Sequence, residues 1–232
     1  MDAFIQLNNQ TAGRDKIIRA LQYGSRAYWF YTQNKHSSSY SVDVLKSLEY
    51  TFSSFRKLLR LGRFFESLYS TFSTINYPDV VLRITMSMSR ISSALFLLAD
   101  HIVWIGRVGI MKVDISKWTS ISNRYWLMML IMNLTRDFYE ILQILKDCRT
   151  NLLWNRTSKG SVLKYYGQVC SHLKYRTDVI SDTIKNGCDI FIPLTALGYT
   201  KLSPGTVGIL GVISSLVGIY TLINPTTKLV PS

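Results

Sequence analysis

Residues 205–223 read GTVGILGVISSLVGIYTLI and contain no charged side chain. A helix of this length spans about 28 Å at 1.5 Å per residue, close to the roughly 30 Å hydrocarbon core of a bilayer. Ser203 and Pro204 supply a helix cap and a first-turn proline, and Asn224 and Pro225 supply a stop. We therefore predict a transmembrane helix over 205–223.

Small residues gather on one narrow face of this helix. They are Gly208, Gly211, Ser215 and Gly218. Such residues let a second helix approach closely, so we expect this face to be a helix-packing surface. The alternative is a buried helix of a soluble core, but glycine destabilises a helix in water and this one carries four.

The charge balance bounds the kind of partner. The 232 residues include 27 Lys or Arg against 14 Asp or Glu, which gives a net charge of +13. Such a surface attracts nucleic acid or anionic lipid. The apolar C-terminal helix favours an anionic lipid membrane, and we expect no nucleic-acid partner. The sequence contains no catalytic motif and no metal-ligand spacing, so we expect neither an enzyme nor a cofactor.

Apolar periodicity predicts an all-α protein. Helices are expected at about 11–33, 42–72, 78–109, 117–154 and 162–186, with Gly187 as a cap and residues 189–200 as a lead-in to the last helix. The expected fold is an integral membrane protein of about five to six helices, with an amphipathic N-terminal half and a C-terminal glycine-rich transmembrane helix. We divide it into residues 1–76, 77–201 and 202–232.

The segment 42–72 is amphipathic and basic. Its apolar stripe moves about 140° around the helix near Leu58, and basic residues occupy the opposite side. This pattern is typical of a helix that lies in an anionic membrane interface. A helix that packs on its neighbours and keeps its arginines in water would show the same pattern. The residues expected to bind the membrane are Lys46, Phe52, Phe55, Arg56, Lys57, Leu58, Leu59, Arg60, Arg63 and Phe65.

A second span is expected at about 91–109. Asp100 and His101 interrupt its apolar run, and intramembrane ionisable groups rarely face lipid. We expect this polar pair to face a partner helix or a wet cavity if the segment spans, and to be ordinary surface residues if it does not. The helix at 117–154 is a further candidate span, and the orientation is left open.

Three blocks of sequence resemble the peroxin-eleven family, and the match runs along the whole chain. The opening block is NQTAGRDKI at 9–17 with LQY at 21–23, the second is FRKLLRLGRF at 55–64, and the third runs from Asp189 through IPL at 192–194 to the glycines of the last helix. Any one block alone is weak, but the three in this order are fairly specific.

The resemblance implies a multi-pass protein of the peroxisomal membrane that promotes membrane elongation, peroxisome proliferation and fission. It also implies homo-oligomerisation and cooperation with the dynamin-type fission machinery and its membrane adaptors. In this interpretation the helix at 42–72 inserts shallowly as a wedge. The alternative function is a pore for small solutes, built by oligomerising the spans around Asp100 and His101.

Overall fold

The computed structural model describes residues 2–33, 39–154 and 176–224. This part of the chain is helical and contains no strand. Its helices are α1 (Asp2–Asn9), α2 (Thr11–Gln33), α3 (Ser39–Leu59), α4 (Arg63–Ile75), α5 (Val80–Val108), α6 (Ile115–Trp154), α8 (Thr177–Ala196) and α9 (Pro204–Ile223). The predicted all-α class is confirmed, while the described residues already form eight helices instead of five to six.

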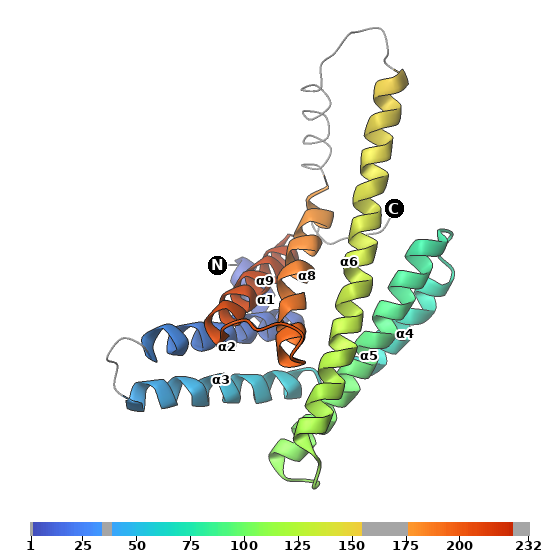
Figure 1. Ribbon diagram of the computed structural model, residues 1–232. Coiled ribbons are helices and arrows are strands. Elements are labelled where there is room, and N and C mark those ends of the chain that lie inside the picture. The colour runs from blue at the N-terminus through green and yellow to red at the C-terminus, as the bar shows by residue number, and fades with distance from the viewer. Residues whose placement is uncertain (1, 34–38, 155–175, 225–232) are drawn as a thin grey trace.

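The helices form two groups that meet along α6 (Figure 1). In one group α2 packs against α3 and α9, and α9 packs against α8. In the other group α5 lies between α4 and α6. Contacts between α6 and α8, and between α3 and α5, join the groups, so segments far apart in sequence meet near the middle of the molecule.

Capping residues define where the helices begin and end. The Asp79 carboxylate accepts hydrogen bonds from the backbone N–H groups of Val81 and Leu82, at 2.7 and 3.1 Å, at the start of α5. Gly109 ends that helix with a φ of 83°. Ser203 caps α9 through a 3.1 Å bond from the N–H of Thr206, so the predicted start of the last helix is confirmed.

Two predicted boundaries are wrong. The single helix expected at 42–72 is broken at Gly62, where a φ of 84° takes the backbone out of the helical region and separates α3 from α4. Gly187 does not cap a helix, because α8 continues through it and through Pro193 to Ala196. The first part of the helix expected at 162–186 lies outside the described residues.

The described interior is unusually polar, and much of the described surface is apolar. Buried residues include Asp15, Arg19, Asp100, Asp137 and Glu140. Long exposed apolar stripes run along two helices. On α5 the stripe is Val81, Ile84, Met88, Ile91, Leu95 and Leu98, and on α9 it is Ile209, Ile213, Leu216, Tyr220 and Ile223. Contiguous apolar surface of this kind marks a membrane or an interaction site.

These stripes belong to the two helices of the described chain that are long and apolar enough to cross a membrane. Val80–Val108 has a mean hydropathy of 1.4, and Pro204–Ile223 has a mean hydropathy of 2.0. Both overlap the spans expected from the sequence, at about 91–109 and 205–223. Length and composition support these spans, and the insertion of either helix into a bilayer stays a prediction.

Candidate functional site

The small-residue face of α9 lies against α2 of the same chain. A Cβ atom added at Gly208 would come within 2.6 Å of the backbone nitrogen of Ala27, and one at Gly211 within 2.3 Å of Tyr23 Cγ. A Cβ at Gly218 would lie 3.1 Å from Cδ of Lys16, and Ser215 is fully buried. The structure thus places all four predicted packing residues on the inner side of α9, with an intramolecular partner.

A buried ionic cluster joins α2 to the C-terminal end of α3. Arg56 is 8% exposed and donates from Nε to Asp15 at 3.1 Å and from Nη1 to Gln22 at 2.8 Å. Arg60 reaches the same Asp15 carboxylate, with Nε 3.3 Å from Oδ1. Burial alone raises the pKa of Asp15, but the charges of Arg56 and Arg60 outweigh it and hold this pKa well below its usual range.

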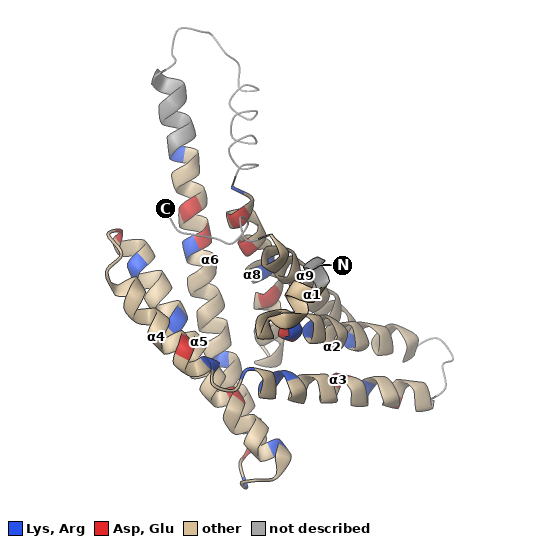
Figure 2. Cartoon of the chain, turned by 180° about the vertical axis from the view of Figure 1, so that it is seen from behind, with Lys and Arg blue, Asp and Glu red and all other residues tan. Residues whose placement is uncertain are grey.

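The same cluster extends to α5. The ammonium of Lys57 pairs with Asp100, and Arg60 Nη1 lies 3.4 Å from the other oxygen of that carboxylate. His101 Nε2 lies 3.1 Å from the carbonyl oxygen of Arg60. Asp100 and His101 therefore face a neighbouring helix, which is the arrangement expected if the segment spans. Figure 2 shows basic residues gathered where α3 approaches α2 and α5.

A second buried connection ties α2 to α8. Arg19 donates from Nη1 and Nη2 to the two oxygens of Asp189, at 3.0 and 2.5 Å. Its guanidinium also lies over the rings of Tyr23 and Trp126, at 5.5 and 5.7 Å. Burial alone would raise the pKa of the Asp189 carboxyl, but the nearby charge of Arg19 outweighs burial and lowers this pKa.

These contacts correct the expected role of three basic residues. Arg56, Lys57 and Arg60 were predicted to bind the membrane, but they are largely buried and paired with Asp15 and Asp100. A helical wheel identifies which side of a helix is basic, but the acidic residues that cover this side come from α2 and α5. The sequence reasoning had no signal for that tertiary pairing.

The other predicted membrane-binding residues have mixed environments. Phe55, Leu58 and Phe65 are exposed by 46%, 42% and 71%. Phe52 and Leu59 are half-buried, and Lys46 Nζ lies 5.1 Å from the ring centroid of Trp29. The half-exposed Arg63 reaches Glu66 at 3.8 Å on the surface of α4. Membrane binding by this set stays a prediction.

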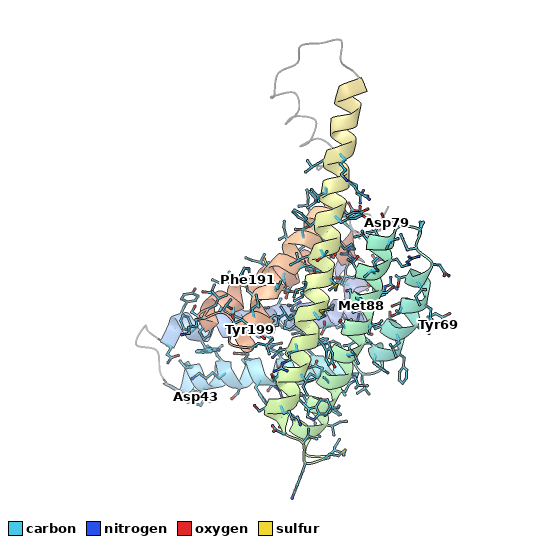
Figure 3. All side chains as sticks on the ribbon, turned by 45° about the vertical axis from the view of Figure 1, so that its right-hand side comes forward. Asp43, Tyr69, Asp79, Met88, Phe191 and Tyr199 are labelled. Atoms are coloured by element: carbon cyan, nitrogen blue, oxygen red, sulfur yellow. The ribbon has the colours of Figure 1, made fainter. Side chains whose placement is uncertain are left out.

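The most exposed aromatic surface among these residues lies on α4. Phe65, Tyr69 and Phe72 are exposed by 71%, 81% and 69%, and Leu68 and Ile75 extend the same side. At 100° per residue these five positions fall within about 120° of the helix. Figure 3 shows Tyr69 at the outer edge of α4, pointing away from α5. The predicted site stopped at Phe65, so it missed Leu68, Tyr69, Phe72 and Ile75.

The sequence pattern described as Peroxisomal biogenesis factor 11 (PEX11) matches residues 1–223. The chain belongs to the PEX11 family. Human "Peroxisomal membrane protein 11B" is 33% identical, with 100% of both chains covered. The family is not a known enzyme family, and the resemblance noted in the sequence is confirmed.

Further PEX11 relatives share almost their full length with this chain. Mouse "Peroxisomal membrane protein 11A" is 33% identical, with 99% of both chains covered. The Dictyostelium discoideum "Peroxisomal membrane protein 11 homolog" is 27% identical over 96% of this chain and 94% of its own. No solved structure matches the chain.

Proposed function

We propose that this PEX11 protein acts in the peroxisomal membrane, where it promotes membrane elongation and peroxisome proliferation by inserting the outer face of α4 into the interface. We call this face, made of Phe65, Leu68, Tyr69, Phe72 and Ile75, the aromatic face. Its exposure is the observation that carries the proposal. An apolar face on a short amphipathic helix stabilises shallow insertion, and shallow insertion expands one leaflet relative to the other.

Contacts on the opposite side of α4 fix the direction of the aromatic face. Ser67 donates to the carbonyl oxygen of Arg90 at 3.0 Å, and Arg90 Nη1 returns a bond to Ser73 at 3.3 Å. The hydroxyls of Thr74 and Ser87 lie 3.2 Å apart, and Thr74 is 1% exposed. The polar side of α4 is thus bound to the candidate span α5, so the aromatic face must point outward.

The wedge proposed here is the aromatic face of α4, in place of the whole segment 42–72 expected from the sequence. Insertion here depends on apolar area more than on headgroup pairing, because Arg56 and Arg60 already neutralise Asp15 and Asp100. Lys46 and Arg63 remain the members of the predicted basic set that have no buried carboxylate partner among the described residues. Homo-oligomerisation and cooperation with dynamin-type fission machinery and its membrane adaptors stay predictions from the family resemblance.

The pore around Asp100 and His101 also stays a prediction. In the structure Asp100 is paired with Lys57 and Arg60 of its own chain, and His101 contacts the Arg60 carbonyl oxygen. These contacts require no second copy of the chain. A pore built on Asp100 predicts bilayer conductance that changes in Asp100→Asn, and an absence of conductance would dispose of it.

A matched pair of variants tests the wedge. Full-length protein is reconstituted into anionic liposomes, and vesicle shape is imaged for wild type and for Phe65→Ser with Tyr69→Ser. The control is Phe191→Ser with Tyr199→Ser, which also removes one exposed phenylalanine and one exposed tyrosine, but away from α4. We expect elongated vesicles with wild type and with the control, and round vesicles with the α4 pair. Equal elongation by all three proteins would refute the wedge, as would equal loss in both variants.

A further inference from the structure

A polar cavity of about 480 Å³ lies where α2, α3, α5, α6 and α8 meet. Nine of its lining side chains are Lys or Arg and three are Asp, so the lining carries a formal excess of six positive charges. The volume lies within the roughly 300 to 1,000 Å³ range of small-molecule sites. This cavity is separate from the aromatic face, whose residues do not line it.

The three aspartates are already engaged by part of this positive charge. Asp189 is bound by Arg19, Asp15 is shared by Arg56 and Arg60, and Asp100 is shared by Lys57 and Arg60. Each carboxylate therefore faces at least one guanidinium, and Arg60 bridges two of them. Three further lining cations pair with carboxylates outside the lining, namely Arg26 with Glu49, Lys185 with Asp182 and Arg63 with Glu66. With these pairs counted, three of the nine positive charges remain in excess, and Lys16 is among the lining cations that form no ion pair within the described residues.

Two cavity-lining groups have unused binding capacity. The Arg19 side chain is 6% exposed, and its Nε–H is buried with no hydrogen-bond partner among the described residues. Lys16 also lines the cavity, and within the described chain no carboxylate lies within ion-pair distance of its ammonium. An unpaired buried N–H donor or cation costs free energy, which a bound anion relieves.

The environment of Lys16 agrees with an uncompensated positive site. Burial, followed by the nearby charge of Arg19, lowers the pKa of Lys16 to about 7, although Asp189 and Asp15 act in the opposite direction. The charge of Lys185 on α8 lowers it further. A bound anion would favour the protonated ammonium and reverse this shift.

We propose that this cavity binds a multivalent phosphate group, with Lys16 and Arg19 as its principal ligands. Guanidinium and ammonium groups on separate helices supply the several N–H donors that phosphate oxygens accept. One carboxylate carries a single charge, whereas a pyrophosphate or a phosphomonoester carries more of the charge that the lining requires. The group belongs either to a soluble phosphate compound or to a phosphorylated lipid headgroup, and the test separates the two sources.

Binding is measured by calorimetry on the full-length protein in an uncharged detergent, with pyrophosphate as the probe. Lys16→Gln removes one ligand without removing the partner of any aspartate. Arg124→Gln is the matched control, because it removes one charge from an exposed position of α6 outside the cavity lining. We expect one pyrophosphate per chain, at least tenfold weaker binding in Lys16→Gln, and wild-type binding in Arg124→Gln.

Proton uptake gives a second, independent measurement. Because the Lys16 pKa of about 7 rises when the anion binds, wild-type protein takes up protons near pH 7.5. Calorimetry in two buffers of different ionisation enthalpy detects this uptake, and Lys16→Gln should lack it. Circular dichroism verifies that each variant is folded. If Lys16→Gln is not folded, Lys16→Arg is tested in its place and should bind pyrophosphate.

Vesicles distinguish the two sources of phosphate. A lipid source predicts that the reconstituted protein binds a soluble phosphoinositide headgroup, and that vesicles containing the parent lipid compete for the same site in a Lys16-dependent way. A soluble source predicts binding of pyrophosphate without competition from those vesicles. Failure of both probes to bind, or equal weakening by Lys16→Gln and Arg124→Gln, would overturn the proposal. Neither result bears on the vesicle elongation assigned to the aromatic face.

Discussion

Arg19 of α2 and Asp189 of α8 form a buried, two-bonded ion pair although 170 positions separate them in the sequence. The side chains are each 6% exposed. The bond therefore connects the first long helix to the segment that leads into the candidate span α9. A buried charge pair of this geometry is costly to break from one side, because the other charge is left buried without a partner.

We expect Asp189→Leu to lower the free energy of unfolding by about 3 to 5 kcal/mol, since it leaves the Arg19 guanidinium uncompensated. The double variant Arg19→Leu with Asp189→Leu should recover most of this loss, because no unpaired charge remains. Thermal unfolding in detergent measures both. A single variant as stable as wild type would show that the pair does not hold α2 and α8 together.

Close packing of α9 on α2 predicts a contrast between glycines. Gly208→Ala should destabilise the protein, because the new methyl group meets backbone atoms of Ala27 at 2.6 to 2.9 Å. Gly187→Ala on α8 meets nothing within 4 Å and should stabilise by about 0.5 to 1 kcal/mol through helix propensity. Unfolding midpoints compare the two, and equal shifts in the same direction would contradict the packing.

Lys16 predicts a pH dependence in the alkaline range. Its pKa is about 7 in the folded protein against 10.5 for an ordinary lysine, so between these values the folded protein binds fewer protons than the unfolded chain. The free energy of unfolding should therefore rise as the pH increases from 7 toward 10. Lys16→Met should flatten this rise in melting temperatures recorded at pH 7 to 9.5 without added phosphate. An unchanged slope would show that Lys16 is not the titrating group.

The sequence predicted the helices whose limits depend on local chemistry. Thr11–Gln33 agrees with prediction at both ends, and α9 begins and ends within a residue of the predicted span. Ser203, Pro204 and Asn224 lie at these limits, and the absence of charge from 205–223 is visible without any tertiary information.

The break at Gly62 was visible in the sequence but was interpreted differently. The apolar stripe moves by about 140° at the point where α3 ends and α4 begins. A shift of that size is expected when two separate helices each carry one apolar stripe. It had been interpreted as a single helix with a broad apolar side. The short α1 carries too few periods of apolar residues for the same reasoning. Pro193 lies inside α8, where its side chain is fully buried.

The ionic cluster required tertiary information. Arg56 and Arg60 are basic residues at helical spacing, which is equally typical of a lipid-binding face and of a packed one. Their partners Asp15 and Asp100 are 41 and 40 positions away along the chain. Periodicity describes each helix alone, so it does not identify which acidic residues lie opposite a basic face.

The depth of α4 in a bilayer tests the central claim most directly. The native cysteines are replaced by serine, and a single cysteine is introduced as Tyr69→Cys or Glu66→Cys. Each variant is labelled with an environment-sensitive fluorophore and reconstituted into liposomes. Tyr69 lies on the aromatic face and Glu66 on the exposed polar side of the same helix. We predict that quenchers attached to lipid acyl chains quench the label at 69 strongly and the label at 66 weakly. Equal and weak quenching at both positions would place α4 in water and contradict the wedge.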